Sequence, residues 1–481
     1  MSAFGVGGFV DAGAPVVSLT KQTPGSALTS PLESMVMSQG ADRVDGRVRQ
    51  GHEEMPEPER RAGEQEPAGR ALRAARGPLI VVAALALAVS GWLVWTHLTR
   101  FHEHISGAQG AFPEALGNEA PSAPSRVMRT TSDTYGVLGG LTIDPSSDGV
   151  VARDLRTGND YWRYGRDGAE LGEVSFADGT VALWWKDDVV VGVDPRSGRP
   201  RWHAEAPYDG GSAAFDDVRA TDGRVVTANR HRLDAFSEND GALLWTAMAP
   251  EGCEWRSGVR YAMPGVLVTP QRCGGDSVSL VALDAGRGTE RWRLPQGLND
   301  FQPADDHTLA TGLWQQYGQG AVVDLSGPKP AIHTLRIPDD HVTVGAGSGV
   351  LLTLATTDRA LSDPIQAYGL SDGWPTWSYE PTEGTTLGGP LIVQDRVYVV
   401  RQPLPERTGQ PRQGRTDLLV LDVHTGRLLH SMRLPDRPPS DGDLTSGRLA
   451  VRQARDGVVG IGWSGTAIFN LRSDRLLIVT D

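Results

Sequence analysis

The sequence predicts an all-β fold: an eight-bladed β-propeller of four-stranded antiparallel blades, preceded by a disordered tail and one transmembrane helix. Three observations support this prediction. A short phrase recurs about every 40 to 50 residues from Ala152 onward, each copy carries turn residues at fixed places, and one long uncharged segment precedes the copies. A period of this length is typical of repeat folds, in which no single unit can bury its apolar face alone.

The clearest copy of the phrase is ARDLRTGNDYW, which contains Asp154, Thr157, Gly158 and Trp162. The Asp and Thr side chains can bond nearby backbone groups, and Gly allows a positive φ, so the phrase contains a tight turn. A second strand then carries Trp four residues after Gly, which predicts a β-hairpin. One large aromatic per sheet at a fixed place suits a radial array of sheets, in which it packs on the neighbouring blade.

Other copies follow along the chain, some of them degenerate. Gly and Trp keep their spacing in the copies that end at Trp202, Trp245, Trp292 and Trp377, whereas His430, Ile332 and Ile478 take the place of Trp elsewhere. The third residue of the phrase is the Asp of ARD in the first copy, and we call it the third position. In the eight copies it is Asp154, Asp194, Ser237, Asp284, Asp324, Gly369, Asp422 and Asn470. Eight blades therefore fit residues 130–481, and seven would require discarding one degenerate copy. We expect residues near 134–142 to pair with the last sheet and close the ring.

The A-x-D-x-x-T-G-x-x-x-W phrase resembles the tryptophan-docking motif of the pyrroloquinoline-quinone (PQQ) repeat propellers, the family that includes the BamB-like propellers. The resemblance covers roughly residues 130–481. It implies a structural role, holding successive blades together, for Trp162, Trp202, Trp245, Trp292 and Trp377. It also implies weaker contacts between blades where Trp is replaced.

Residues 78–96, PLIVVAALALAVSGWLVWT, contain no charged residue and are about long enough to cross a bilayer. A buried core helix is the alternative, but polar, unpatterned flanks leave it nothing to pack against. No small-residue cleavage pattern follows, which disfavours a signal peptide. Arg70, Arg73 and Arg76 precede the segment, so the positive-inside rule places the N-terminus in the cytoplasm.

We therefore expect four regions in a single-pass protein of the cell membrane. They are a disordered cytoplasmic tail (1–76), a transmembrane helix (77–99), an extracytoplasmic stalk (100–129) and an extracytoplasmic propeller (130–481). The net charge is −13, and residues 1–76 contribute only −1 of it, from 9 basic and 10 acidic residues. The outer region is thus acidic, which argues against nucleic acid as its partner.

The sequence contains two cysteines, Cys253 and Cys273, on either side of a predicted strand–turn–strand segment. Outside the cytoplasm such a pair usually closes a disulfide, which we expect here, with two free buried thiols as the alternative.

Two groups of residues have the composition of metal ligands. One is a repeated Asp-Asp-His phrase, formed by Asp305, Asp306 and His307 and by Asp339, Asp340 and His341. Carboxylates and imidazoles bind metals, but each phrase directly precedes a strand, where Asp is an ordinary turn residue. The other is formed by His97, His102 and His104, which lie close together where the expected helix ends and the expected stalk begins. We expect turn residues and incidental histidines, and no metal site.

The family that this chain resembles contains both PQQ dehydrogenases and binding propellers. The enzymes typically carry a disulfide between adjacent cysteines over the quinone, and this sequence has no Cys-Cys pair. We therefore expect no catalytic residues and no cofactor, and a non-enzymatic binding, scaffold or sensor module. Its expected partners are proteins of the cell envelope, and its single span contacts the lipid bilayer. The alternative is a PQQ- or metal-dependent oxidoreductase.

Overall fold

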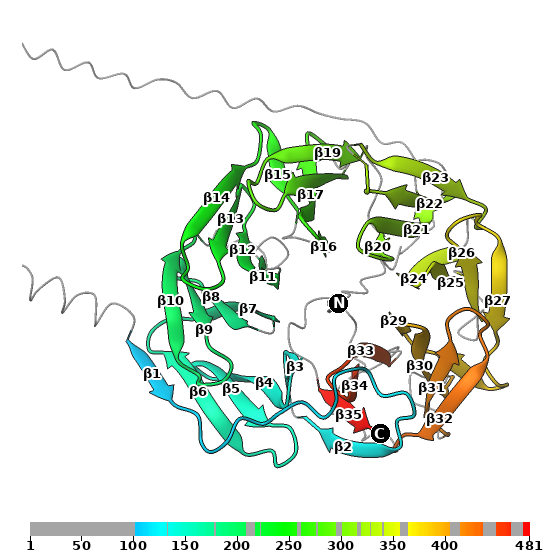
Figure 1. Ribbon diagram of the computed structural model, residues 1–481, viewed down its shortest axis with the longest axis horizontal. Helices are drawn as coiled ribbons and strands as arrows, with labels where there is room; N and C mark the ends of the chain where they lie inside the picture. The colour runs from blue at the N-terminus through cyan, green and yellow to red at the C-terminus, as the bar shows by residue number, and fades with distance from the viewer. Residues whose placement is uncertain are drawn as a thin grey trace, which may run out of the picture. The chain divides into compact units, whose positions relative to one another are not determined.

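The structure is a computed structural model that describes residues 102–481 with gaps at 132, 178, 208–216, 222, 257–260, 276–277, 295–300, 315–318, 328, 339–340, 356–363, 405–413, 436–448 and 463–474. Strands are the regular elements of this part, and they form eight antiparallel sheets arranged as a ring (Figure 1). The prediction of an all-β, eight-bladed propeller is confirmed.

The first four blades run in chain order from the inner strand to the outer one. Blade 1 contains β3 (Gly136–Leu138), β4 (Leu141–Ser146), β5 (Gly149–Asp154) and β6 (Asp160–Arg166), and blade 2 contains β7 (Leu171–Ala177), β8 (Thr180–Trp185), β9 (Val189–Val193) and β10 (Pro200–Glu205). Blade 3 contains β11 (Asp217–Thr221), β12 (Arg224–Ala228), β13 (Arg232–Ser237) and β14 (Leu243–Met248). Blade 4 contains β15 (Cys253–Trp255), β16 (Tyr261–Met263), β17 (Val266–Cys273), β18 (Val278–Asp284) and β19 (Glu290–Leu294).

The next three blades continue the same order. Blade 5 contains β20 (Gln302–Pro303), β21 (Thr308–Trp314), β22 (Gln319–Asp324) and β23 (Ala331–Leu335), and blade 6 contains β24 (His341–Gly347), β25 (Val350–Ala355), β26 (Ile365–Gly369) and β27 (Pro375–Tyr379). Blade 7 contains β28 (Thr385–Leu387), β29 (Leu391–Val393), β30 (Arg396–Pro403), β31 (Asp417–Asp422) and β32 (Leu428–Arg433).

Blade 8 is assembled from both ends of the described chain. The C-terminal region supplies β33 (Ala450–Arg455), β34 (Val458–Gly462) and β35 (Leu476–Thr480), and β2 (Arg126–Thr130) adds the outer strand by pairing with β35. Ring closure by an N-terminal strand was expected, but at residues 134–142. That location was wrong, because Gly136–Leu138 form the inner strand of blade 1 instead.

The hydrophobic core is divided into eight clusters, one at each junction between neighbouring blades. Trp162 lies in the cluster between blades 1 and 2, for example, and Tyr398 in the one between blades 7 and 8. The junction between blades 8 and 1 contains Val137 and Ile478, both fully buried. Continuous burial around the ring, including the junction that joins the two ends, is what a closed propeller requires.

The segment expected to be a stalk lies on the propeller. Strand β1 (Glu103–Ser106) pairs with β6 as a fifth, outermost strand of blade 1. The chain then makes hydrogen bonds to four blades before it enters β2. Ala108 N–H donates to Ser197 O of blade 2, and Gln109 N–H donates to Tyr161 O of blade 1. Leu116 N–H donates to Asp456 O of blade 8, and Pro121 O accepts from Tyr398 OH of blade 7. The stalk prediction is thus replaced by a strap, residues 107–125, that crosses half of the ring.

The expected transmembrane segment at 77–99 and the tail before it lie outside the described residues. In the part of the chain that the structure describes, no helix has the length and apolarity needed to span a membrane.

Candidate functional site

The repeated phrase forms the turn between the third and fourth strands of a blade. In blade 1, Asp154 Oδ1 accepts the backbone N–H groups of Arg156 and Thr157, at 2.8 and 2.7 Å. Gly158 has φ of 78°, as the turn requires. A bulge between Ala152 and Arg153 then places Trp162 opposite Ala152 on the outer strand.

Four of the five tryptophans make the same contact with the next blade. Each donates its indole N–H to the backbone carbonyl that follows the third position of the next copy: Trp162 to Pro195, Trp202 to Glu238, Trp245 to Ala285 and Trp377 to Val423, at 2.7 to 2.9 Å. The indole also covers the turn glycine of that copy, so that a Cβ added there would lie 2.4 to 2.6 Å from the ring. Gly is therefore required for close packing as well as for its φ.

The remaining tryptophan, Trp292, packs in the cluster shared with blade 5, which includes Leu325. It is buried, with 8% of its surface exposed. These contacts place all five tryptophans at blade junctions.

The replaced positions correct part of the sequence analysis. His430 lies opposite Val420, as a Trp would, and its Nε2 donates to Pro124 O of the strap at 2.7 Å. Blade 5 lacks the bulge that precedes Trp162 in blade 1. Val322 takes the place that Ala152 has in blade 1, and His333, not Ile332, lies opposite it.

In blade 8, Ile478 lies on the third strand, and Arg129 of β2 pairs with it at the Trp position. A Cβ added to Gly158 of blade 1 would lie 2.6 Å from the Arg129 guanidinium, which therefore covers that turn as Trp does elsewhere. The sequence analysis placed Ile478 on the outer strand of blade 8, whereas it lies on the third strand and β2 is the outer one. Asn470, taken as the Asp-equivalent residue of this copy, lies outside the described residues.

The candidate metal ligands do not form a site in the described residues. Asp305 Oδ1 accepts the backbone N–H of His307 at 2.8 Å, which is the bond of a turn. His341 is buried, and its Nδ1 bonds Thr353 Oγ1 at 2.8 Å. No group of three or more His, Cys, Asp or Glu suited to a metal occurs in the described ranges, which exclude Asp339 and Asp340.

Of the three histidines His97, His102 and His104, the first lies outside the described residues. His104 Nε2 lies 2.6 Å from Asp148 Oδ2 and its Nδ1 lies 3.6 Å from Asp167 Oδ1, so it has acidic partners that are distant in the sequence. These contacts hold β1 against blade 1.

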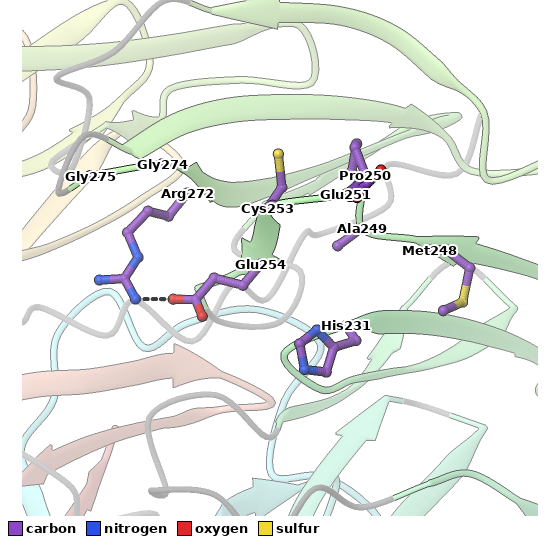
Figure 2. Close-up of a pocket in the computed structure, with 11 residues that line it drawn as sticks. His231, Met248, Ala249, Pro250, Glu251, Cys253, Glu254, Arg272, Gly274 and Gly275 are labelled. Carbon is purple, nitrogen blue, oxygen red and sulfur yellow. Dashed lines mark hydrogen bonds and ion pairs between the residues drawn. The ribbon is translucent and has the colours of Figure 1, made fainter. Parts of the chain in front are cut away.

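A cleft of about 640 Å³ lies where blades 3 and 4 meet. Three chain segments form it: the turn that contains His231, the connection from Met248 to Glu254, and Arg272 with the turn after it (Figure 2). Met248, Ala249 and Pro250 make one part of its lining apolar, whereas Glu251, Glu254 and Arg272 make another part charged. The volume is within the range of ligand sites.

The charged part of the cleft is organised around Glu254. Its carboxylate bonds the Arg272 guanidinium and lies 3.6 Å from Arg230 and 3.7 Å from Arg256. The Glu254 side chain is 17% exposed, so its ion pairs are partly protected from solvent. On the other side, Asn229 Oδ1 accepts the backbone N–H of His231 at 3.0 Å and fixes the turn that carries this imidazole.

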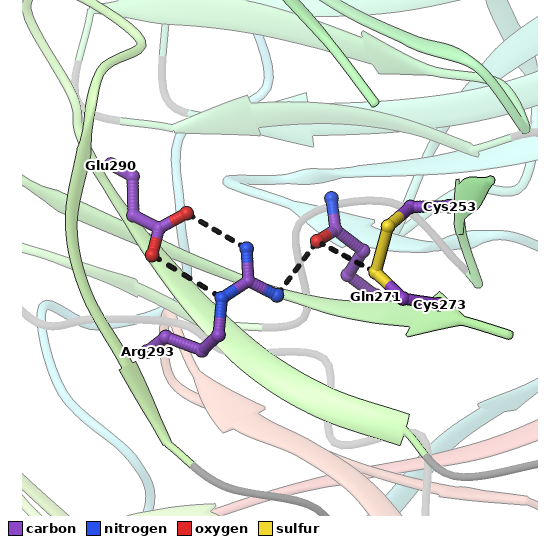
Figure 3. Close-up of a disulfide and its surroundings, with 5 residues drawn as sticks. All are labelled: Cys253, Gln271, Cys273, Glu290 and Arg293. Carbon is purple, nitrogen blue, oxygen red and sulfur yellow. Dashed lines mark hydrogen bonds and ion pairs between the residues drawn. A yellow bond between two sulfur atoms is a disulfide. The ribbon is translucent and has the colours of Figure 1, made fainter. Parts of the chain in front are cut away.

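The two cysteines are joined by a disulfide, as predicted, and Cys253 lies at the edge of the cleft. They are opposite each other on β15 and β17, so the bond links the inner strand of blade 4 to the next strand. Behind it, Arg293 donates to Gln271 Oε1 at 2.7 Å and pairs with Glu290 at 2.8 Å (Figure 3). The disulfide leaves no free thiol in this chain.

Sequence patterns did not predict this cleft. Its lining comes from turns and connections that lie outside the repeated phrase. The only indication in the sequence was the Cys pair, which brackets the inner hairpin of blade 4.

A family model described as outer membrane protein assembly factor BamB matches residues 146–311. The matched range contains blades 2, 3 and 4 in full, and with them the cleft. Over this range, about a third of the chain, the propeller is similar to the PQQ-like family. No curated protein matched the chain.

Several solved structures are similar to this propeller. BamB from Moraxella catarrhalis is 13% identical, with a TM-score of 0.44, and the match covers 74% of this chain and 100% of that one. The computationally designed Ika8 protein is 14% identical, with a TM-score of 0.46, over 77% of this chain and 100% of that one. The quinohemoprotein alcohol dehydrogenase ADHIIG from Pseudomonas putida HK5 is 12% identical, with a TM-score of 0.43, over 78% and 76%. These values are too low to transfer a function.

Proposed function

We propose that this protein is a membrane-tethered, extracytoplasmic propeller that binds another protein through the cleft between blades 3 and 4. The observation that carries the proposal is the composition of the cleft. An apolar part that includes Met248 and Pro250 lies beside a charged part built on Glu254 and Arg272. Such a mixed surface suits a polypeptide segment, which offers apolar side chains and charged groups together.

Two features support binding over chemistry at this cleft. Its cysteine is held in a disulfide and is not available as a nucleophile. Its carboxylate Glu254 is already engaged by arginines, whereas a general base must be within reach of a substrate proton.

The flexible thioether of Met248 adapts to partners of different shape. The match to a family model named for an assembly factor supports the same class of function.

Tethering and location rest on the sequence. The uncharged segment at 78–96 and the arginines before it support a single span with the propeller outside. The disulfide between Cys253 and Cys273 supports an oxidising compartment for the propeller.

Site-specific photo-crosslinking in intact cells tests the proposal. A photoreactive amino acid replaces Glu251, an exposed residue of the cleft. The matched control replaces Ser371, an exposed residue of the turn between the third and fourth strands of blade 6. Antiparallel topology puts that turn at the opposite ends of the strands from the cleft connections.

We expect a discrete protein adduct from position 251 and none from position 371. Equal labelling from both positions, or none from either, would overturn the proposal. The oxidoreductase alternative is tested on the purified protein supplied with PQQ and calcium. Electron transfer from an alcohol to an artificial acceptor would support that alternative.

A further inference from the structure

The outer edge of blade 3 differs from those of the other blades. Strand β14 has the sequence LLWTAM, without a charged residue or a proline. Leu243, Leu244 and Met248 are 53%, 46% and 62% exposed. Strand β32 of blade 7 also exposes two leucines, Leu428 and Leu429, but it ends in the charged Arg433. Within the described residues, β14 pairs only with β13, so its other edge carries unpaired backbone groups.

Other blades carry a charge where blade 3 carries Thr246 or Met248. Thr246 and Met248 lie one and three residues after Trp245. The equivalent positions in another blade are therefore one and three residues after the residue that stands at the Trp position of its outer strand. In six of the other seven blades one of these two positions holds a charged residue, namely Arg163, Glu205, Arg293, Arg336, Glu380 and Arg433. Charges on edge strands prevent pairing between molecules, and blade 3 lacks that protection.

The structure itself shows that a blade of this propeller accepts a fifth strand. Strand β1 pairs antiparallel with β6 over four residues at the outer edge of blade 1. The edge of β14 offers the same geometry. Ala249 N–H donates to His231 O, toward β13, at 2.8 Å. Because the bonds of an antiparallel ladder alternate, Thr246 and Met248 direct their backbone groups to the open edge.

The side chains of β14 are complementary to a second copy of the same strand. A two-fold axis at Thr246 places Leu244 of one copy opposite Met248 of the other, and the two Thr246 side chains opposite each other. All three residues are exposed, whereas Trp245 is buried and Ala247 is half-buried between them, so the three lie on one face; Leu244 does so at the bulge that precedes Trp245. Apolar pairs and Thr–Thr pairs are favourable across strands, and no like charges face each other along this edge. A symmetric contact of this kind closes on itself and does not form fibres.

We infer that two copies of this protein associate edge to edge through β14, and that blade 3 forms a continuous sheet across the dimer. The contact is small compared with a standard interface, so we expect a weak dimer in the micromolar range. The contact shares Met248 with the lining of the cleft. It does not require a partner to be bound there, because within the described residues β14 pairs only with β13 whether or not the cleft is occupied.

Cysteine crosslinking on the purified full-length protein tests the inference. Thr246→Cys places two thiols next to the axis, and mild oxidation should link most of the protein into a dimer. The matched control is Ser378→Cys, at the same position on the outer strand of blade 6, where Glu380 follows. Ser378 is exposed too, so random collision would link both variants alike. Linking of both, or of neither, would overturn the inference.

A second pair of variants covers the case in which Thr246→Cys folds poorly, since Thr246 Oγ1 also donates to Asp234 at 2.6 Å. Leu244→Lys adds one positive charge from each copy to the dimer interface, so two charges are introduced. The dissociation constant measured by sedimentation equilibrium should rise at least about tenfold. Leu429→Lys, at the same position of blade 7, should leave association unchanged. A monomer at all concentrations in the unmodified protein, or equal effects of the two substitutions, would contradict the dimer.

Discussion

Where another residue replaces tryptophan at a blade junction, different atoms make the contact. In His430 the replacing side chain still donates a hydrogen bond to a backbone carbonyl. His430 donates to a carbonyl of the strap, Pro124 O, where a Trp donates to the turn of the next blade. Because a carbonyl only accepts, His430 Nε2 must carry the proton in this bond. Arg129 covers Gly158 with a guanidinium in the same way. These two replacements each keep part of what Trp supplies, a hydrogen-bond donor in His430 and a flat group over the turn in Arg129. Between blades 5 and 6, His333 is exposed, and backbone atoms of Leu335 and Arg336 lie over the turn glycine Gly373 instead.

Replacing Trp202 by Ala removes a buried ring and its hydrogen bond to Glu238 O, and should lower the free energy of unfolding by about 3–5 kcal/mol. Trp292→Ala should cost a similar amount. His430→Ala removes a smaller, half-buried ring and one hydrogen bond, so we expect a loss of about 1–2 kcal/mol. Chemical denaturation of the three variants checks this order, and equal losses would count against a special role for Trp.

Glu103 makes the attachment of β1 sensitive to acid. Burial by itself raises the pKa of this carboxyl, but hydrogen bonds from His203 and Tyr164 and the charges of His203 and Arg166 lower the pKa below its ordinary value of 4.5. A lowered pKa means that the unfolded chain binds the proton more tightly. The stabilisation by Glu103 is thus present above pH 4.5 and is lost as the pH falls through the lowered pKa.

We therefore expect β1 to separate from β6 on acidification below about pH 4.5. Hydrogen exchange at the amides of residues 103–106 should then rise while the other strands stay protected. In Glu103→Gln this step should become smaller, because that side chain no longer titrates and of the two carboxylates only Asp148, the partner of His104 on β1, still does. An unchanged exchange profile in both proteins would refute the attachment by Glu103.

At the scale of the element, the disulfide joins two neighbouring strands of blade 4. Closing the loop between Cys253 and Cys273, which are 20 residues apart, restricts the unfolded chain and stabilises the fold by about 2–4 kcal/mol. A variant with both cysteines changed to Ser should lose that amount in denaturant unfolding. It should also bind less well at the cleft, because Cys253 lies at its edge. Stability equal to that of the unmodified protein would contradict this prediction.

The repeated phrase predicted the hairpin of the third and fourth strands, because Asp, Gly and Trp each have one physical reason to be where they are. Elements without the phrase were not predicted. Strands β1 and β2 carry no turn residues and no large aromatic, so they looked like linker. Ile332 and Ile478 were misassigned because a fixed spacing assumes the bulge, which blade 5 lacks, and because blade 8 takes its outer strand from residues 126–130. The cleft depends on connections that carry no repeating pattern.

At the scale of the molecule, the N-terminal part of the described chain holds the ring together. β1, the strap and β2 contact blades 2, 1, 8 and 7 in turn, and β2 completes the last sheet. If the span lies where the sequence predicts it, a pull on the anchor acts along this path and is shared among four blades. A propeller held in this way resists opening at the junction between blades 8 and 1, where β2 pairs with β35.

The propeller proposed above binds its partner on the outside of the membrane that carries it. Reporter fusions in cells test it most directly, with an enzyme that is active only outside the cytoplasm joined after residue 60 in one protein and after residue 481 in another. We expect activity from the fusion at 481 and none from the fusion at 60, with the opposite result for a reporter that is active only in the cytoplasm. If both ends were found on the same side of the membrane, the protein would not span it once, and an extracytoplasmic propeller on a cytoplasmic tail would be wrong.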